Sequence, residues 1–294
     1  IVLNEQFEFL KSTVNESIEN NLINLTFDIE ESQKFYVEKI NIFGNNVTRE
    51  DVIRNNLIVD EGDPFNELLQ TKSVNNLKSL NFFSKVDTEI INSENPNKKI
   101  INITVEEKPT GEIMAGAGVG TTGGTLAFGV SENNFLGRGI EFTSDLSVSS
   151  ETLKGLISIN NPNYKGSNRS LNTSIESTIS DRLADFGYKS NKTGFSLGSG
   201  FEFYDDLYWN TGVSTYVEKL ETDATASATM KKQEGSYFDT YFNQTFSYDK
   251  RNQRYKTSNG YISRFTQNIP LISDTYTLTN GYDYKIYNQW LDES

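Results

Sequence analysis

Histidine and cysteine are both absent from the 294 residues of this chain. Their absence excludes disulfide frameworks, thiol chemistry, zinc sites built from Cys and His, and every catalytic triad that needs a histidine. Basic residues are also scarce, with 27 Lys and Arg against 40 Asp and Glu, which gives a formal net charge of −13. Nucleic-acid binders need clustered cations that replace phosphate counterions. The sequence therefore predicts no nucleic-acid partner, no cofactor and no metal site.

Long apolar runs are missing as well, because no stretch reaches the roughly 18 residues of a membrane-spanning helix. The first residues carry no charged segment followed by an apolar one, so we expect the natural N-terminus to lie upstream of Ile1. Membrane strands are not excluded by this, because only every second residue of such a strand faces lipid. A content of 35% hydrophobic and 12% aromatic residues is ample for a folded core.

The composition changes near residue 110. Of fifteen tyrosines only Tyr36 precedes Pro109, and both tryptophans follow it. Nine of the twenty-one glycines lie between Gly111 and Gly139. We therefore expect a domain boundary at residues 108–111, with residues 111–294 forming one later domain.

The first part contains an internal repeat. Residues 25–31 (LTFDIEE) resemble residues 101–107 (INITVEE) at an offset of 76 positions. A strand and an Asn-rich turn precede both segments, so residues 1–31 are predicted to be the tail of one module and residues 34–108 a complete second copy.

Within that copy the patterns predict the order β-α-α-β-β. A strand at residues 35–43 ends in a Gly-Asn-Asn turn, and Thr48 is expected to cap a helix that runs to about Ile58. Asp63-Pro64 is expected to start a second helix. Two strands, residues 82–91 and 100–107, close the unit.

That order resembles a POTRA domain. The resemblance is carried by Ile42-Phe43-Gly44-Asn45 with Thr48 after it, and by Leu80-Asn81-Phe82-Phe83 followed by Val86. A generic α+β domain with the same element order is the alternative.

The second part alternates apolar and polar residues over about ten segments of nine to fourteen residues, between residues 112 and 287. Membrane strands have this length, whereas a soluble sandwich, the alternative, has shorter strands and could not bury the polar row. Aromatic residues gather near the expected strand ends, as in the girdle of a membrane barrel. They are Tyr164, Tyr188, Tyr204, Tyr208, Trp209, Tyr255, Tyr261, Tyr287 and Trp290.

Three turns resemble those of the BamA family of outer-membrane assembly factors. They are Glu132-Asn133-Asn134-Phe135-Leu136-Gly137-Arg138-Gly139, then Asn161-Pro162-Asn163-Tyr164, and Asp249-Lys250-Arg251 with Thr257-Ser258-Asn259-Gly260, where Lys256 replaces the usual proline. The resemblance implies an α+β POTRA domain followed by an antiparallel transmembrane β-barrel. Family barrels have sixteen strands, an Arg-Gly-Phe loop motif and an aromatic C-terminus, which this sequence lacks. We therefore expect a truncated fragment with about ten of sixteen strands; an isolated ten-stranded closed barrel is the alternative.

The resemblance also implies a mechanism at the first barrel strand, residues 112–120. There a client's C-terminal strand would pair at a weak lateral seam. Glycines on the inner face favour a weak seam because they offer no cross-strand packing, but they also suit a lumen that must make room for another segment. The candidate client-pairing residues are Ile113, Ala115, Gly116, Ala117, Gly118 and Val119.

A second candidate site is the strand edge of the POTRA copy, at Val86, Thr88 and Ile90, which would bind an extended client or an accessory lipoprotein. The resemblance places the protein in the outer membrane of Gram-negative bacteria, with the POTRA part in the periplasm. Its expected partners are nascent β-barrel proteins, periplasmic or lipoprotein subunits of an assembly complex, and outer-membrane lipids.

Other functions remain open at this point. A two-partner secretion or TamA-like transporter also joins POTRA domains to a barrel. A passive porin lacks a POTRA arm, so the repeat argues against it. An enzyme would have to use carboxylates such as Glu141, Asp145 and Glu176, which stand in regular alternation without a Ser-His partner; the sequence predicts no enzyme.

Overall fold

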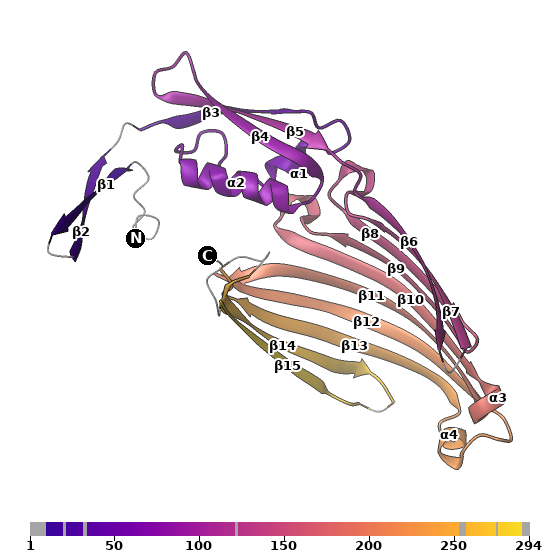
Figure 1. Cartoon of the computed structure of the whole chain (residues 1–294). Coiled ribbons are helices and arrows are strands. Elements are labelled where there is room, and N and C mark those ends of the chain that lie inside the picture. The colour runs from indigo at the N-terminus through magenta and orange to yellow at the C-terminus, as the bar shows by residue number, and fades with distance from the viewer. Residues whose placement is uncertain are drawn as a thin grey trace. The chain divides into compact units, whose positions relative to one another are not determined.

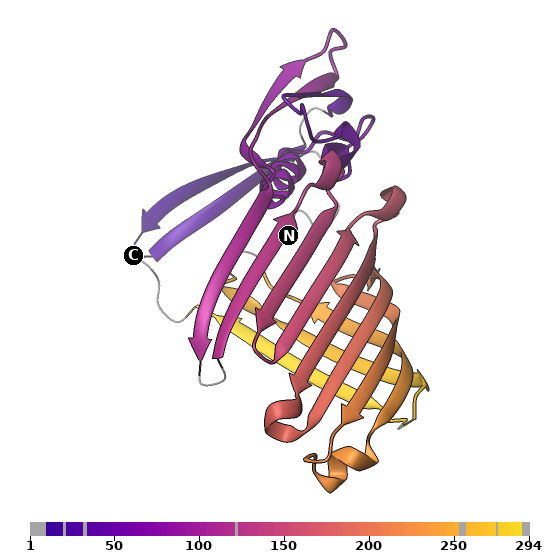
Figure 2. The ribbon, with the colours of Figure 1, turned by 90° about the vertical axis from the view of Figure 1, so that its right-hand side faces the viewer.

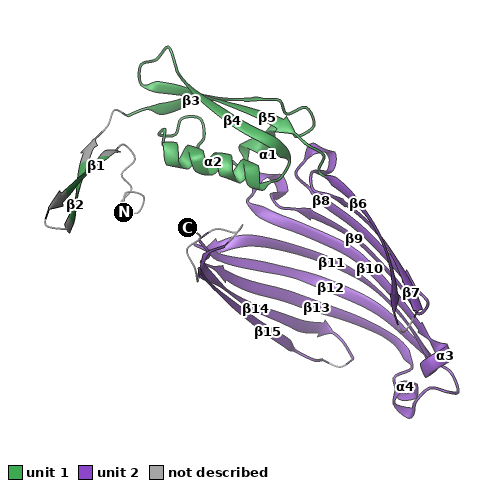
Figure 3. Ribbon diagram, in the orientation of Figure 1, with its two compact units in different colours: residues 1–110 green, residues 111–294 purple. Residues whose placement is uncertain are grey.

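The chain divides into two compact units, Ile1–Thr110 and Gly111–Ser294 (Figures 1 and 3). The structure is a computed structural model that describes residues 10–19, 22–31, 34–120, 123–252, 257–274 and 276–289. Each unit is described by itself.

A two-stranded hairpin opens the first unit. Strands β1 (Leu10–Glu19) and β2 (Leu22–Glu31) pair antiparallel, with Leu10 opposite Glu31. The repeated segment at residues 25–31 lies in β2, and its copy at residues 101–107 lies in the last strand of the following domain. Both copies are therefore the second strand of an antiparallel pair. That residues 1–31 end a preceding module stays a prediction, and residues 1–9 lie outside the described residues.

The predicted order β-α-α-β-β is confirmed in the rest of the first unit. Its elements are β3 (Tyr36–Phe43), α1 (Glu50–Arg54), α2 (Glu67–Ser79), β4 (Phe83–Asn92) and β5 (Lys98–Glu107). The three strands form one sheet in the order β3-β5-β4, with β3 parallel and β4 antiparallel to the central β5.

Both predicted helix starts were wrong. Helix α1 begins after Arg49 and has no side-chain cap, while the backbone N–H of Thr48 donates to Glu107 at 2.6 Å instead of belonging to a capping box. Helix α1 also ends at Arg54, short of Ile58. Helix α2 starts after Asn66, whose side-chain oxygen accepts from the N–H groups of Leu68 and Leu69. The Asp63-Pro64 segment is a loop that runs beside β3.

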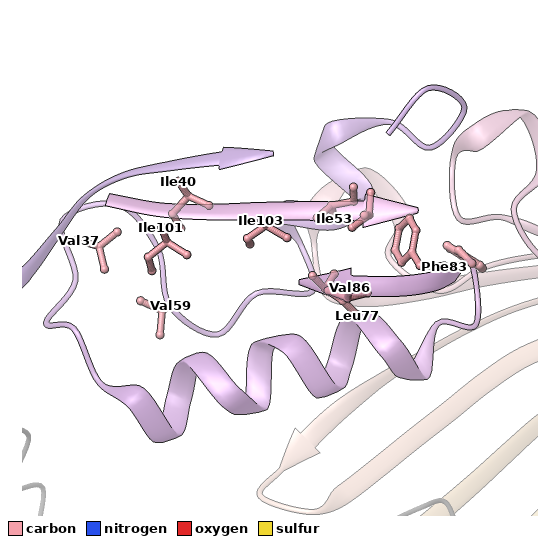
Figure 4. Packing of buried hydrophobic residues seen from close by; sticks show 11 residues of the cluster. Val37, Ile40, Ile53, Val59, Leu77, Phe83, Val86, Ile101 and Ile103 are labelled. Carbon is pink, nitrogen blue, oxygen red and sulfur yellow. The ribbon is translucent and has the colours of Figure 1, made fainter. Parts of the chain in front are cut away.

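The core of residues 34–108 lies between α2 and the three-stranded sheet (Figure 4). Leu77 of α2 and Ile101 and Ile103 of β5 are fully buried, and Ile53 joins them from α1. A central strand with β-branched residues and a helix with a leucine face explain this packing, because each element buries one apolar side. The core needs no contribution from the second unit.

The second unit is a ten-stranded antiparallel sheet in which each strand pairs with its neighbour in sequence (Figures 1 and 2). Four short helices lie in its turns and loops: η1 (Phe135–Gly137), η2 (Tyr164–Gly166), α3 (Leu183–Phe186) and α4 (Ala228–Lys232). The strands are β6 (Gly111–Gly120), β7 (Gly123–Glu132), β8 (Glu141–Ser149), β9 (Thr152–Asn161), β10 (Arg169–Arg182), β11 (Tyr188–Tyr204), β12 (Leu207–Thr222), β13 (Gly235–Asp249), β14 (Asn259–Ile272) and β15 (Thr279–Asn288).

Three of these strands are longer than predicted. β11, β12 and β13 have 17, 16 and 15 residues, against an expected maximum of fourteen. The extra length of β11 lies in residues 188–194, where Lys189 and Asn191 occupy positions of the apolar face and so interrupt the alternation of apolar and polar residues. Polar residues can lengthen a strand, but they produce no apolar periodicity in the sequence from which the extra length could be predicted.

The apolar face of this sheet is uncovered. Phe195, Leu197 and Phe238 remain 48–49% exposed, although they are large hydrophobic side chains in the middle of long strands. In the described part of the second unit, only Leu220, Ala226 and Ile262 are buried hydrophobic residues. A soluble sandwich would bury such a face in a dry core, so this arrangement excludes that alternative.

Candidate functional site: the open edges of the two sheets

Strand β6 forms one end of the ten-stranded sheet. Among the described residues it pairs only with β7, in a register that places Gly111 opposite Glu132 and Gly120 opposite Gly123. All ten of its residues are exposed. One long side of β6 therefore presents backbone N–H and C=O groups without a partner strand in the described chain.

The predicted site residues of β6 divide between the two faces of the sheet. Ile113 and Val119 are 86% and 94% exposed on the apolar face, which they share with Ala115 and Ala117. Gly116 and Gly118 lie on the opposite face, where their partners on β7 are Ala127 and Thr125. The residues that the sequence singled out thus form one continuous, thinly covered strand.

Crowding does not explain the glycines of β6. A Cβ added at Gly116, Gly118 or Gly120 would meet nothing within 4 Å, whereas a Cβ at Gly129 of β7 would lie 2.8 Å from Asp145 Oδ1. No neighbouring atom among the described residues therefore requires glycine at these three positions. The effect of the glycines is to leave Ala127 and Thr125 of β7 without a side chain opposite them on β6, which weakens the pair at these positions.

The three-stranded sheet of the first unit has one covered edge and, among the described residues, one open edge. Residues 62–65 run along the outer side of β3, with hydrogen bonds from Val37 N to Asp63 O and from Gly62 N to Val37 O. Farther along, Glu61 accepts from the N–H of Ile40 at 3.0 Å, and Arg54 donates to the C=O of Ile40 at 2.8 Å. These contacts occupy the groups that would otherwise recruit another strand.

The open edge is β4, the strand that the sequence singled out. The side chain of Val86 is buried in the core, whereas Thr88 and Ile90 are exposed, Ile90 by 40%. A strand added to this edge would pair with the backbone of β4. Because the side chain of Val86 is buried in the core, only the exposed side chains beside it, such as Thr88 and Ile90, could contact the added strand. Sequence reasoning missed the covering of β3, because Glu61 and Ile40 are 21 positions apart and no motif links them.

Glu107 links the end of β5 to the loop before α1. Its carboxylate accepts N–H bonds from Asn46 and Val47, each at 2.9 Å, in addition to the bond from Thr48. Burial acts to raise the pKa of Glu107, but the hydrogen bonds from Thr48, Val47 and Asn46 outweigh it, so the pKa lies below its ordinary value. This carboxylate holds the loop before α1, and its bond to Thr48 spans 59 positions of the sequence.

With the geometry described, comparison with known proteins identifies the family. The model of the Omp85 superfamily domain matches residues 134–294, more than half of the chain. This chain belongs to the Omp85 superfamily. A second family model, the surface antigen variable number repeat of POTRA domains, matches residues 35–108 of the same Omp85 chain.

Curated relatives of this Omp85 chain are named outer membrane protein assembly factor BamA. The protein from Nitratidesulfovibrio vulgaris is 26% identical over 96% of this chain and 36% of the relative, and that from Neisseria meningitidis serogroup B is 30% identical over 60% of this chain and 22% of the relative. The chain therefore spans about a third or less of the length of these relatives.

Solved structures share its fold. A crystal structure of BamA from Haemophilus ducreyi lacking POTRA domains 1–3 has a TM-score of 0.67 at 21% identity, over 94% of this chain and 56% of that one. CdiB from Acinetobacter baumannii has a TM-score of 0.53 at 13% identity, over 93% of this chain and 52% of that one. These likenesses support the POTRA-plus-barrel fold. The protein resides in the outer membrane with its POTRA part in the periplasm. No helix in the described part of the chain is both long and apolar enough to span a bilayer.

Two of the turns that resemble the family prove to be the same structure used twice. Asn134 Oδ1 accepts from Gly139 N at 2.7 Å, and Asn163 Oδ1 accepts from Asn168 N at 2.9 Å. Each asparagine is followed by a short 3-10 turn with a positive φ at its second residue. The signal is present in the sequence as Asn-Phe-Leu-Gly against Asn-Tyr-Lys-Gly, 29 positions apart.

The third turn is held by a charged pair. Arg251 donates from Nε and Nη2 to the two carboxylate oxygens of Asp249 at 2.8 and 2.7 Å, and Lys250 reaches Asp206 in the preceding turn at 2.5 Å. Gly260 has a φ of +106°, and a Cβ there would lie 2.1 Å from the carbonyl oxygen of Lys250. Tyr255, Lys256 and Trp290 lie outside the described residues.

Proposed function

We propose that this chain belongs to an assembly factor that folds and inserts β-barrel proteins into the outer membrane, and that β6 is the edge on which client strands are templated. The observation that carries this proposal is the glycine content of β6: a Cβ at Gly116, Gly118 or Gly120 would meet nothing within 4 Å, so at these positions β6 offers no side chain to pack against a neighbouring strand. The name of the curated relatives supports it.

The need for a template follows from the bilayer. An unpaired strand edge in hydrocarbon leaves backbone N–H and C=O groups unsatisfied, at a cost of several kcal/mol each. A nascent barrel strand that pairs with β6 satisfies those groups before the client barrel closes. Ile113, Ala115, Ala117 and Val119 then face lipid beside the apolar residues of the client, and Gly116 and Gly118 accept inward side chains without collision.

The open edge of β4 is proposed as a second docking edge in the periplasm. It would accept an extended segment of a client or of a periplasmic or lipoprotein subunit by strand addition at Thr88 and Ile90. The covered edge of β3 supports this assignment, because the contacts of Glu61 and Arg54 with Ile40 leave β4 as the accessible side of the POTRA sheet. The proposed role involves no enzymatic step.

A transporter that exports a polypeptide is the alternative function. The CdiB structures from Acinetobacter baumannii and Escherichia coli have this fold as well, with TM-scores of 0.53. A transporter would keep its first strand paired within its own barrel during work and pass its substrate through the lumen. The two functions therefore differ in what β6 contacts.

Disulfide trapping distinguishes them, and the absence of cysteine from this chain makes it direct. Single cysteines replace Ile113, Ala115 and Ala117 in the full-length protein, and cysteines are placed in turn along the C-terminal strand of a nascent barrel protein. Templating predicts a cross-link at each position, with the client partner moving by two residues in the opposite direction for each two-residue step along β6.

Cysteine at Gly116, on the opposite face of β6, is the matched control. It should cross-link only to client residues of the other parity. If no client is trapped while the same cysteines join β6 permanently to another strand of the protein itself, templating is wrong and the transporter is favoured.

A further inference from the structure

A row of neutral polar side chains crosses the membrane face of the sheet. Register and strand alternation place these residues directly opposite one another on five neighbouring strands, on the same face as the apolar Leu197 and Val213. We call this set the polar row. Its members are Ser199, Thr211, Gln244, Gln267 and Asn280.

The amides of the polar row form a hydrogen-bonded ladder. Gln244 Nε2 donates to Gln267 Oε1 at 2.8 Å, and Gln267 Nε2 donates to Asn280 Oδ1 at 2.9 Å. Each glutamine uses one of its two N–H groups in this ladder. Within the described chain, the row therefore keeps further donors that face the membrane.

An aromatic row lies two residues from the polar row, on the side of the turns at residues 205–206 and 250–258. These turns lie at the end of the sheet where β6 begins, immediately after the periplasmic POTRA part. The indole of Trp209 stacks on Phe246 at 5.7 Å between ring centres. Members of the aromatic row are Phe201, Trp209, Phe246, Phe265 and Tyr282.

Two donors at this level have no partner in the described chain. They are the indole Nε1 of Trp209 and the hydroxyl of Thr211, both buried beneath neighbouring side chains. Unsatisfied polar groups are costly in hydrocarbon but not in the lipid headgroup region, where water and ester oxygens are present. Because both atoms are closed to solvent, it is the partly exposed amide donors of Gln244, Gln267 and Asn280 that favour water or ester oxygens over dry hydrocarbon.

We propose that the polar row binds the ester carbonyl oxygens of phospholipids in the periplasmic leaflet. Donors that carry no charge suit a neutral acceptor, and the polar row contains no Lys or Arg as a phosphate site would. The hydrocarbon in contact with β11–β14 then begins one row farther from the periplasm, at Leu197, Val213, Phe242 and Ile269.

This placement shortens the apolar band on one flank of the sheet. One row is two residues, about 7 Å along a strand and about 5 Å along the membrane normal at the usual barrel tilt. The bilayer beside β11–β14 is therefore thinner than beside strands without the row. The inference rests on the outer-membrane location and not on client pairing, so the two proposals can fail separately.

The test measures the depth of a nitroxide on Val213→Cys, one row above the polar row, in the full-length protein reconstituted in diester phospholipid vesicles and free of other cysteines. Depth is obtained from the relative accessibility of the label to oxygen and to a water-soluble nickel complex. The test variant is Gln244→Leu with Gln267→Leu. Its matched control is Asn243→Leu with Asn268→Leu, which changes the opposite face of the same two strands.

The polar-row variant should place the label about 5 Å deeper, since the hydrocarbon then reaches the aromatic row. The control should leave the depth unchanged, and heat-modifiable gel migration verifies that both variants fold. Equal depth in the parent and the polar-row variant would show that the ladder already lies in hydrocarbon, and would overturn the proposal.

Vesicles of diether phospholipids, which keep the phosphate and lack the ester carbonyls, identify the ligand. In them the parent should show the same deepening as the polar-row variant does in diester lipid. If the depth of the parent instead stays unchanged in diether lipid, the acceptor is the phosphate or water, and the assignment to the ester carbonyl is wrong.

Discussion

The ring of Tyr216 lies against Gly194, its cross-strand partner on β11, so that a Cβ added at Gly194 would fall 2.5 Å from two ring carbons. The ammonium of Lys192 lies 4.5 Å from the centre of the same ring. The ring thus covers a position without a side chain, and it belongs to the inward, polar face of the sheet. This contact joins β11 to β12, the two longest strands of the described sheet.

Gly194→Ala should therefore displace Tyr216 and destabilise the sheet. Overpacking of this kind costs about 1–3 kcal/mol. The measurement is the urea midpoint of heat-modifiable migration in the full-length protein. Gly155→Ala on β9 is the control, because a Cβ there meets nothing within 4 Å. Equal midpoints for the two variants would contradict the contact.

Glu107→Gln should loosen the loop before α1. The loss of a charged acceptor for three N–H groups should lower the local opening free energy by about 1–3 kcal/mol. Amide hydrogen exchange at Asn46, Val47 and Thr48 measures it. Glu106→Gln is the control, since the side chain of Glu106 is exposed on the neighbouring position. Unchanged exchange in Glu107→Gln would show that the carboxylate does not hold the loop.

The same loop should depend on pH. The pKa of Glu107 is lowered in the folded protein, so its stabilisation is complete above the unfolded value of about 4.3 and is lost as the pH falls through the folded value. Protection of the three amides should therefore decline only below about pH 4.3. Protection that instead declined on raising the pH through neutrality would have the wrong sign for this carboxylate.

Leu77→Ala should destabilise the POTRA core by about 2–5 kcal/mol, because it opens a cavity against β5. Limited proteolysis and hydrogen exchange across residues 34–108 measure the loss. Leu68→Ala on the same helix is the control, since Leu68 is 55% exposed. A comparable loss in both variants would place the core elsewhere.

Gly118→Thr should strengthen the β6–β7 pair. The new side chain stands opposite Thr125 in open space, and a cross-strand contact with less backbone freedom should stabilise the pair by about 1 kcal/mol. Client trapping at Ala117→Cys should fall accordingly if opening of the seam limits pairing. Gly155→Thr, distant from the seam, should leave trapping unchanged; an equal fall would point to a general effect on folding.

Periodicity was enough to predict the order of the elements. Alternation of apolar and polar residues predicted about ten long strands between residues 112 and 287, and the repeat at offset 76 located β2 and β5. These signals are local, because each depends on which residues of one strand share a face. Strand ends were less predictable, since the polar residues of β11 between Tyr188 and Gly194 extend the strand without an apolar pattern.

Contacts between distant segments were not predictable in the same way. Thr48 carries the signature of a helix cap, yet its N–H is bound by Glu107 from the far end of the domain. The polar row was hidden because Gln244 and Gln267 become neighbours only through the register of β13 and β14. No single strand shows the pattern, so the register had to be known first.

The link between Lys250 and Asp206 joins the turn after β13 to the turn after β11, and Asp249 N adds a bond to Asp206 O at 2.9 Å. The turns after β11 and β13 are thus joined to each other, whereas in the described part of the chain β6 has a ladder with one neighbour, β7. Under lateral tension we expect β6 to separate from β7 before the strands β11–β14 separate from one another, because the turns of those strands are linked. The turns, together with the strand ladders, thereby set the order in which neighbouring strands separate.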